Sequence, residues 1–525
     1  MAEPFYITTA ISYPNGKPHI GHAYEAIAAD VIARHQRMQG RDVRFQTGTD
    51  EHGLKMAQKA RELGQTPKQL ADEMSQYFID MCDNLNVSYD VFQRTTETRH
   101  HAASQELWRR MEANGDLYLD RYEGWYSVRD EAYYDESELI EDAGSEKLSP
   151  QGTPVEWTVE ESWFFRLSNY AERLLKLYAE QPDFIRPDSR RNEIMRFVEG
   201  GLRDLSVSRT SFDWGVKVPG SGASGGSVHV MYVWVDALTN YLTGLGFPDE
   251  SSDFARYWPA DLHLIGKDIT RFHTIYWPAF LWSAGIDIPR HVFSHGFLLN
   301  RGQKESKSLG NVTDPIDLAE RFGVDVLRYF LMREVAFGQD GSYSPEAIVL
   351  RANAELANSF GNLAQRSLSM IFKNLGGVLR SDLDASAADT ELESTVRANI
   401  GTLVWNFDSL SFSDGIEAWM RAVFACNQYV DDQAPWALRT NDPERMTAVL
   451  MTLFRCVRDL AIAIRAVVPD AADKLLDQLG IAADQRDFAA LNDPNWFVRL
   501  VASGFTVTQP VGIFPRLELS KETAT

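Results

Sequence analysis

Hydrophobic and polar positions alternate in the first part of the chain in a way that predicts a strand, a helix and a second strand. Residues 5–11 are rich in β-branched and aromatic side chains, which is typical of a buried strand. The segment 14–18 contains two prolines, an asparagine and a glycine, and it ends that strand. From His22 to Met38 the apolar residues recur at helical spacing, and residues 43–47 again have the composition of a strand. A strand, a helix and a strand in this order begin a parallel α/β sheet.

The alternation of strands and helices is lost between residues 116 and 228 and then returns. This segment is dense in aromatic side chains, as at 124–126 and 163–165, and we interpret 116–228 as an α+β insertion. After it, three apolar runs predict further buried strands: 229–235, 262–265 and 292–299. We therefore expect a parallel, nucleotide-binding (Rossmann-like) sheet, formed by 1–115 and 229–343 and split by the insertion.

Beyond residue 343 the pattern becomes helical almost to the end of the chain. Ser344 followed by Pro345 is a good helix start, because proline fits the first position of a helix. Further helical periodicities follow, including 446–467. The predicted fold class is therefore α/β, followed by an α-helical bundle over 344–525.

The composition is that of an ordinary globular protein with several domains. The chain has 525 residues, of which 44% are apolar and 24% are charged. It has no apolar stretch long enough to cross a bilayer, and its first residues lack the pattern of a secretory signal. Cys82, Cys426 and Cys456 are far apart and form no Cys-x-x-Cys pair, which argues against a disulfide framework and a cysteine zinc site. We expect a cytoplasmic protein with no membrane partner.

The net charge of −22 argues against a nucleic-acid partner, because phosphate contacts need lysine and arginine. The summed charge describes solubility more than local sites, however, so a local basic surface remains compatible with it. The middle of the chain contains one candidate basic track: Arg186, Arg190, Arg191, Arg196, Arg203 and Arg209. These arginines fit a nucleic-acid track and a set of solvated helix faces about equally well.

The segment His19-Ile20-Gly21-His22 lies where the first predicted helix begins. Two histidines three positions apart fall on the same side of a helix start, where their ring N–H groups and the positive end of the helix dipole would face one point. Gly21 has no side chain, so a flat ligand such as adenine could approach the backbone there. This arrangement favours a nucleotide and phosphate site. Two capping or surface histidines are the alternative, and both interpretations remain open for this motif.

A second short motif, Lys-Glu-Ser-Lys-Ser at 304–308, follows a predicted strand and has glycines on both sides. Its two lysines and its hydroxyl side chains would form a flexible cationic loop. Such a loop can close over a triphosphate and neutralise the charge that develops during phosphate transfer. A polar surface loop is the alternative, because Lys-Ser runs are common.

The two motifs together resemble the HIGH and KMSKS signatures of class I aminoacyl-tRNA synthetases, in the same order and at a similar separation. Further stretches resemble the methionyl-tRNA synthetases within that class: 10–16, 47–53, 232–237, 265–269, 272–273 and 277–278. They cover the α/β part, and residues of the bundle extend the match. The resemblance implies that ATP activates methionine to methionyl-adenylate, and that the methionyl group then passes to the 3′-terminal adenosine of tRNA(Met).

The resemblance also implies a methionine pocket beside the first helix, formed by Ile11, Tyr13, Asp50, Trp234, Ala237, Tyr241, Ile269 and His273. In this pocket Asp50 would hold the substrate ammonium in a charge-assisted contact. Trp234 would close over the apolar side chain, while Tyr13 and His273 would reach the thioether sulfur. Ordinary core packing is the alternative for these aromatic residues.

For the nucleotide, the resemblance implies contacts from Lys17, Gly21, Gly266, Lys267, Asp268 and Lys307. His19 and His22 would donate to the phosphates, and Lys304 and Lys307 would hold the leaving pyrophosphate together with Mg²⁺. The implied reaction needs no protein nucleophile, because its rate comes from positioning and from stabilisation of charge at the phosphate.

In the bundle, the resemblance implies that the CAU anticodon is bound by Asn362, Arg366, Pro435 and Trp436. Trp436 would stack on an unpaired base, although an amphipathic core position is the alternative for it. Many relatives carry a cysteine zinc knuckle in the insertion. This chain has no cysteine between Cys82 and Cys426, so we predict ATP and Mg²⁺ but no bound zinc, which metal analysis can check. No basic module follows the bundle, and we expect a monomer.

Two other functions remain open at this point. A class I synthetase for isoleucine, leucine or valine would use the same loops, and one methylene in a pocket is worth only about 1–3 kcal/mol. Those enzymes resemble longer chains with an editing insertion, which this chain lacks. A non-catalytic tRNA-binding relative would explain Glu305, which stands where the family usually has an apolar residue. The four retained histidines and lysines of the two motifs argue against it.

Overall fold

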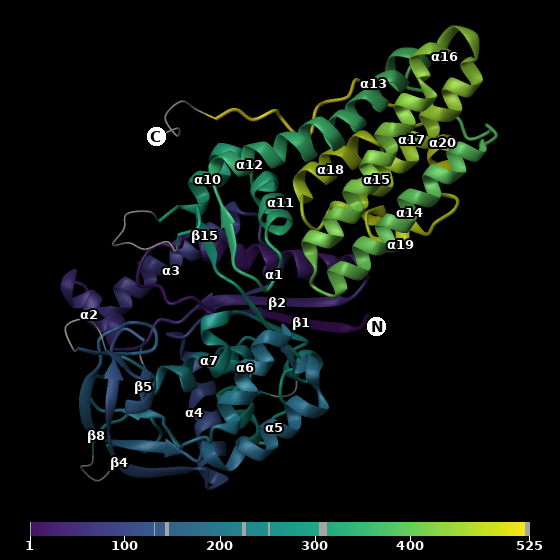
Figure 1. Ribbon diagram of the computed structural model, residues 1–525. Helices are drawn as coiled ribbons and strands as arrows, with labels where there is room; N and C mark the ends of the chain where they lie inside the picture. Colours follow the sequence, from purple (N-terminus) through teal and green to yellow (C-terminus); the bar gives the residue numbers. More distant parts are fainter. Residues whose placement is uncertain are drawn as a thin grey trace.

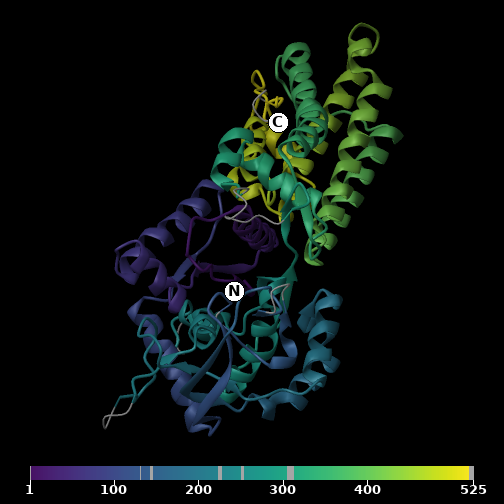
Figure 2. The same cartoon turned by 60° about the vertical axis from the view of Figure 1, so that its left-hand side comes forward.

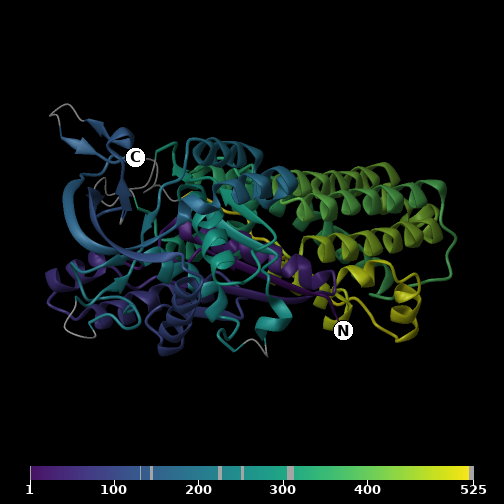
Figure 3. The same cartoon turned by 90° about the horizontal axis from the view of Figure 1, so that it is seen from below.

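The computed structural model describes residues 2–130, 132–141, 146–222, 227–249, 253–303 and 312–519. A central α/β part, with β1 and β2 at its middle, has a part rich in strands on one side and a helical bundle on the other (Figure 1). The turned views show the same parts, with the bundle at one end of an elongated molecule (Figure 2 and Figure 3). Among the described residues, no helix combines the length and the apolar character needed to cross a membrane.

The central sheet is parallel and joins strands from distant parts of the chain. Over the described ranges its order is β3–β2–β1–β13–β14–β9. The strands span Pro4–Thr9 (β1), Asp42–Thr49 (β2), Val91–Arg94 (β3), Ile185–Arg186 (β9), Leu262–Gly266 (β13) and Val292–His295 (β14). In the register, Ile7 of β1 lies between Phe45 of β2 and Leu262 of β13. The chain order reverses between β1 and β13, and ligands of such sheets bind at the carboxyl ends of the strands beside this reversal.

Helices cover both faces of the sheet: α1 (Ile20–Met38), α2 (Leu54–Glu62), α3 (Pro67–Asn84), α4 (Thr98–Ala113), α7 (Val233–Thr243), α8 (Asp253–Tyr257), α9 (Trp277–Ser283), α10 (Pro315–Phe322) and α11 (Val324–Glu334). Alternate residues of β1 belong to two separate cores, as the two-residue period of a strand requires. Phe5 and Ile7 pack in a core shared with α1 and the bundle. Tyr6 packs in a core shared with α4, α7 and α9.

An antiparallel sheet dominates the region between the two halves of the central sheet. Its order in the described residues is β10–β8–β4–β5, with β4 at Leu117–Ser127, β5 at Ala132–Tyr134, β8 at Glu156–Phe165 and β10 at Leu205–Ser206. Helices α5 (Ala171–Glu180) and α6 (Asp188–Glu199) follow β8, and two short pairs complete the region: β6 (Ile140–Glu141) with β7 (Lys147–Leu148), and β11 (Ser208–Arg209) with β12 (Val230–Met231). Between α5 and α6, β9 pairs with β14. The range 116–228 therefore also contributes a strand to the central sheet.

Two of the six arginines considered as a basic track donate to backbone carbonyls of the protein. Arg209 is buried and donates to the backbone carbonyl of Ser208 at 2.7 Å. Arg186 donates to the carbonyl of Ser409 in the bundle at 2.7 Å. These two guanidinium groups donate to backbone carbonyls, so a track that includes all six arginines, one of the two interpretations left open by the sequence, is not formed.

The last part of the described chain is a helical bundle, as predicted. Its helices are α12 (Pro345–Arg351), α13 (Asn362–Leu375), α14 (Ala387–Asp408), α15 (Phe412–Gln433), α16 (Pro435–Asn441), α17 (Pro443–Ile464), α18 (Pro469–Gln478), α19 (Phe488–Leu491) and α20 (Trp496–Ala502). Ser344 caps α12 by accepting the N–H of Ala347 at 3.2 Å, which confirms the predicted helix start. A π-helical segment, Ala352–Gly361, joins α12 to α13.

Two of the predicted strands differ from the structure. The run 229–235 forms the two-residue strand β12 and then the beginning of α7, because α7 is buried almost all round and its apolar run cannot be told from a buried strand by periodicity. The run 292–299 is divided into β14 and β15 (Leu298–Asn300), and β15 pairs with β16 (Gly341–Tyr343). Gly296 lies at the break, where a Cβ would be 2.2 Å from the backbone of Gln339.

A buried ion pair connects the sheet to the bundle. Asp30 in α1 and Arg328 in α11 are fully buried, and their side chains are 2.6 Å apart. Arg328 also donates to the carbonyls of Ala466 and Val467 after α17, each at 3.0 Å, and to the carbonyl of Leu85 before β3 at 3.2 Å. One guanidinium in α11 thus satisfies groups from three other segments of the chain.

We expect Arg328→Met to lower the free energy of unfolding by about 3–5 kcal/mol, because it leaves a buried carboxylate and several carbonyls without their donor. Urea denaturation followed by circular dichroism measures the change. Arg109→Met is the matched control, since Arg109 is 54% exposed and pairs only loosely with Glu106 at 3.5 Å. Equal losses in the two variants would contradict the prediction.

Candidate active site

The two histidines of the first motif cap helix α1 with their own rings. Nδ1 of His19 accepts the N–H of Gly21 at 3.0 Å, and Nδ1 of His22 accepts the N–H of His19 at 3.1 Å. The ring centroids lie 3.9 Å apart. Because Nδ1 accepts in both neutral rings, the ring proton of each is on Nε2. Capping and donation were alternatives in the sequence, but this geometry is compatible with both at once.

The structure gives a steric reason for a glycine at position 21, which the sequence did not indicate. A Cβ at this position would lie 2.9 Å from Cε1 and 3.0 Å from Nδ1 of His19. The glycine therefore makes room for the capping ring of His19, whatever ligand approaches from outside.

The ends of β1 and β2 lie side by side at the reversal of the strand order. The N–H of Ser12 donates to the carbonyl of Gly48 at 2.9 Å, and the N–H of Asp50 donates to the carbonyl of Ser12 at 2.9 Å. These contacts place Tyr13 and Asp50 at the same edge of the sheet. The hydroxyl of Tyr13 accepts the N–H of Met56 at 3.0 Å, which holds Tyr13 beside the start of α2.

His273 forms the buried centre of a second group of predicted residues. Its Nδ1–H donates to the carbonyl of Ile269 at 3.1 Å, and its Nε2 accepts the hydroxyl proton of Tyr241 at 2.7 Å. Burial lowers the pKa of His273 to about 4, so the ring is neutral at neutral pH. Both ring nitrogens are thus engaged by protein groups.

Helix α7 contributes Trp234, Ala237 and Tyr241 to this group, and the three have the spacing of one helix face. The Trp234 ring stacks on Phe272 with a centroid distance of 3.8 Å and lies edge-on to His273 at 6.0 Å. Phe272 and His273 belong to a π-helical turn, Phe272–Tyr276, a local geometry that often marks functional sites.

The strand ends that carry Tyr13 and Asp50 are neighbours of the group around His273. Burial raises the pKa of Tyr241 well above its ordinary value, and the nearby carboxylates of Glu25 and Asp50 raise it further. His52, two residues after Asp50, lies 2.6 Å from the carboxylate of Asp236 in α7, which places the segment of Asp50 beside the helix of Tyr241. Of the predicted pocket residues, the structure brings Asp50 and Tyr241 together with the Trp234 and His273 group.

Glu25 and His295, which are not among the predicted site residues, are paired with each other. Nε2 of His295 lies 2.8 Å from a carboxylate oxygen of Glu25. Burial raises the pKa of Glu25 even though His295 lowers it, and the charge of Asp268 raises it further. Two signals pointed to these residues: Glu25 is three positions after His22 on α1, and His295 ends strand β14.

The predicted nucleotide residues are partly paired within the protein. Nζ of Lys267 lies 2.7 and 2.8 Å from the two carboxylate oxygens of Asp340. Asp268 is exposed, and Gly266 precedes it at the end of β13. Lys17 is exposed and lies over the ring of Tyr77 at 4.7 Å. The predicted loop lysines, Lys304 and Lys307, lie outside the described residues.

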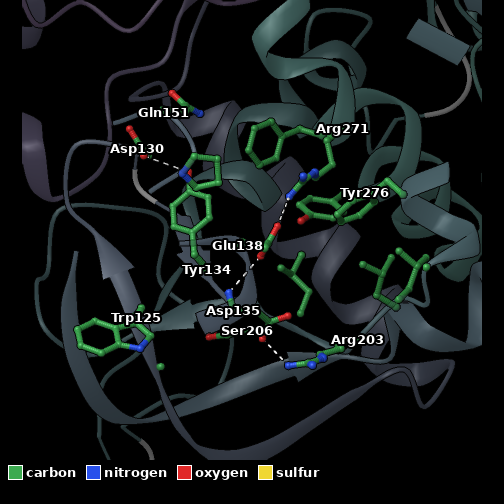
Figure 4. Close-up of a pocket in the computed structure, with 18 of the residues that line it drawn as sticks. Trp125, Asp130, Tyr134, Asp135, Glu138, Gln151, Arg203, Ser206, Arg271 and Tyr276 are labelled. Carbon is green, nitrogen blue, oxygen red and sulfur yellow. Dashed lines mark hydrogen bonds and ion pairs between the residues drawn. The ribbon is translucent and has the colours of Figure 1, made fainter. Parts of the chain in front are cut away.

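A cavity of about 1130 Å³ separates the antiparallel sheet from this region (Figure 4). Lys267, Asp268 and Phe272 line it on the side of the central sheet, and Trp125 and Arg203 line it on the side of the antiparallel sheet. Figure 4 shows Arg271 directed at Glu138 across the cavity, with 3.4 Å between their charged groups. The space therefore reaches from the predicted nucleotide residues to the surface of the antiparallel sheet.

The predicted anticodon residues gather at one place in the bundle. The guanidinium of Arg366 in α13 lies 5.7 Å from the ring centroid of Trp436 in α16. Trp436 is 51% exposed, which rules out the core position that was its alternative. Asn362 is exposed one helical turn before Arg366, and Pro435 begins α16.

Comparison with known proteins decides the family. A model described as "tRNA synthetases class I (M)" matches residues 5–368, and a model of the anticodon binding domain of methionyl tRNA ligase matches residues 381–523. The chain belongs to the methionyl-tRNA synthetase family. Curated family members of high similarity include the methionine–tRNA ligases of Brucella suis, 54% identical over 515 residues, and of Mycobacterium tuberculosis, 54% identical over 521 residues. Each match covers 98% of both chains.

Solved structures of the family agree over the whole chain. The methionyl-tRNA synthetase of Mycobacterium tuberculosis in complex with methionyl-adenylate has a TM-score of 0.91 at 53% identity, covering 98% of this chain and 100% of that one. The apo form of that synthetase has a TM-score of 0.87 at 50% identity, covering 99% of each chain. These matches favour a methionine enzyme over the isoleucine, leucine and valine alternatives.

The capping geometry separates two roles of His19, and His19→Asn tests them. Asparagine is a strong N-cap residue, so the helix start and the melting temperature should be retained. The ring Nε2 donor is lost, and we expect the rate of methionine-dependent ATP–pyrophosphate exchange to fall about 10²–10³-fold. An Asn variant with wild-type exchange would assign His19 to capping alone, as would a variant that loses stability and activity in parallel.

Proposed function

We propose that this member of the methionyl-tRNA synthetase family is a methionine–tRNA ligase. It activates methionine with ATP to methionyl-adenylate and transfers the methionyl group to the 3′-terminal adenosine of tRNA(Met). The observation that carries the proposal is the match, over nearly the whole chain, to a synthetase solved with methionyl-adenylate. The site geometry supports it, because Asp50 and His273 follow the carboxyl ends of β2 and β13, at the edge of the parallel sheet where the capped helix α1 also begins.

Methionine recognition is assigned to the group around His273. The ammonium is held by Asp50 in a charge-assisted contact, and Trp234, Ala237, Tyr241, Ile269 and His273 surround the side chain, with Ile11 and Tyr13 at the adjoining edge. His273 is neutral and has both nitrogens engaged, so it offers an uncharged surface to the polarizable thioether. A neutral wall costs less to desolvate around an apolar side chain than an imidazolium would.

ATP is assigned to the start of α1 and the end of β13. Nε2–H groups of His19 and His22 extend the positive end of α1 toward the phosphates, and Gly266, Lys267 and Asp268 lie at the strand end beside the reversal of the sheet. Lys17, Gly21, Lys304 and Lys307 complete the proposed set. Mg²⁺ enters with the triphosphate, because this ion is generally held by substrate phosphates and few carboxylates. We propose no zinc in the insertion.

The tRNA would meet the protein at two places. Its acceptor end must reach the adenylate, and the cavity lined by Trp125 and Arg203 adjoins Lys267 and Asp268. Its anticodon is assigned to Asn362, Arg366, Pro435 and Trp436, where an exposed aromatic ring and a guanidinium offer stacking and hydrogen bonds to unpaired bases. We propose that the enzyme acts as a monomer in the cytoplasm.

ATP–pyrophosphate exchange with a panel of amino acids tests the function. We expect exchange that depends on methionine, because nearly the whole chain matches a synthetase solved with methionyl-adenylate. Exchange with isoleucine or leucine in place of methionine would assign the chain to another specificity. No exchange with any amino acid would favour the non-catalytic relative that Glu305 suggested.

The anticodon assignment predicts a loss confined to tRNA. Stacking of a base on an aromatic side chain is worth about 1–3 kcal/mol, so Trp436→Ala should raise the KM for tRNA(Met) about 5- to 150-fold. Exchange, which needs no tRNA, should stay unchanged. Trp405→Ala is the matched control, because Trp405 is 67% exposed on α14 and has no assigned base. Similar effects of both variants on KM would contradict the assignment.

A further inference from the structure

A buried carboxylate bridges two histidines directly behind the proposed methionine pocket. Asp236 in α7 is fully buried, and His52 and His100 are buried with it. Nδ1–H of His52 donates to one carboxylate oxygen at 2.6 Å, and Nε2–H of His100 donates to the other at 2.6 Å. We call these three residues the Asp236 clamp. In the chain, His100 lies 136 positions and His52 lies 184 positions before Asp236.

Each histidine of the clamp contacts one oxygen of Asp236, and His100 has a further polar contact. The hydroxyl of Thr243 lies 3.0 Å from Nδ1 of His100 and 3.1 Å from the carbonyl of Thr239. Asp236 therefore receives donors on both of its oxygens. Burial raises the pKa of Asp236, but the two histidines lower it below its ordinary value. The carboxylate is therefore charged and fully paired.

The clamp joins the two elements that carry the proposed methionine contacts. His52 is two residues after Asp50, and the intervening Glu51 is held by Arg94 at 2.6 and 3.0 Å. Asp236 lies between Trp234 and Ala237 on α7. Because His52 meets Asp236, the clamp links the segment of Asp50 with the helix of Trp234 through one charge-assisted bond.

We propose that Asp236 is a positioning residue for methionine, which sets the distance between Asp50 and the pocket face of α7. The inference rests on the proposed function, in which Asp50 holds the ammonium and Trp234 covers the side chain. Methionine spans both elements, so its binding depends on their relative placement. ATP does not span them, and its binding should be independent of the clamp.

The test measures exchange kinetics of Asp236→Asn with the full-length enzyme. Asparagine keeps the size of the side chain but offers only one acceptor oxygen, so one histidine loses its bond. We expect the KM for methionine to rise at least tenfold, while the KM for ATP stays within about twofold. A purely structural carboxylate would instead reduce the melting temperature and the active fraction without selective change in the KM for methionine.

Asp116→Asn is the matched control. Asp116 is also buried and accepts hydroxyl protons from Tyr170 and Ser283, each at 2.6 Å, in the same half of the molecule. We expect it to lower the melting temperature and leave the KM for methionine unchanged. An equal rise of that KM in Asp116→Asn would overturn the inference, because the effect would then follow from any lost buried carboxylate.

Two variants of His100 keep the test decisive if Asp236→Asn does not fold. The amide nitrogen of glutamine can occupy the place of Nε2, so His100→Gln should retain the KM for methionine within about threefold, and His100→Ala should raise it at least tenfold. Equal KM values in the Gln and Ala variants would overturn the inference.

The wild-type enzyme in the same assay separates the two proposals. Wild-type exchange with methionine, together with an unchanged KM in folded Asp236→Asn, would overturn the positioning role and leave the function intact. Absence of methionine-dependent exchange in the wild type would overturn the function, and the inference with it.

Discussion

The ion pair of Asp30 with Arg328 is the constraint on which the arrangement of the chain depends. Asp30 also accepts from Arg34 at 2.7 Å and from the backbone N–H of Ser88 at 2.7 Å, so every oxygen of this buried carboxylate is used. Arg328 meets carbonyls that follow α17 and precede β3. The pair is stable only when α1, α11, the end of α17 and the segment before β3 are all in place. Each part of the structure therefore depends on the docking of the others.

Helix α1 carries this constraint to the active site. Its first turn holds His19 and His22, its middle holds Asp30, and His35 near its end lies 2.9 Å from Asp408 of the bundle. A helix of 19 residues is stiff on this scale, so the position of its capped end follows from the contacts further along it. The anticodon bundle and the adenylate site thus share one structural element.

The sequence predicted the parts of the fold that have a clear period and failed where burial removes it. The helix predicted from 22 to 38, the strands at β1, β2 and β13, and the start of the bundle at Ser344 are all confirmed. The beginning of α7 was included in the strand predicted over 229–235, since its apolar run has no exposed face to give a helical period. The two-residue strand β9 could not be predicted either, because its place in the sheet is decided by pairing with β14.

The sequence predicted the residues of the proposed methionine pocket, but not the buried residues that hold them in position. Trp234, Tyr241 and His273 come together as expected, because the family resemblance supplies their positions. Glu25 with His295, and Asp236 with two histidines, are interactions between segments 136 to 270 positions apart, and a single sequence does not specify which residues pair over such separations. The sequence also posed capping and donation by His19 and His22 as alternatives, whereas the rings can do both with different nitrogens.

Because Nδ1 caps the helix and Nε2 carries the proton, the shape of the start of α1 depends on the protonation of His19 and His22. Nδ1 of each ring can hold a proton or accept a backbone N–H, but not both. A second proton on either imidazole would add positive charge where phosphate is expected and at the same moment release the first turn of α1. The first turn of α1 can therefore keep its ordered form only while each imidazole carries a single proton. Extra positive charge on these histidines is incompatible with a rigid nucleotide site at the helix start.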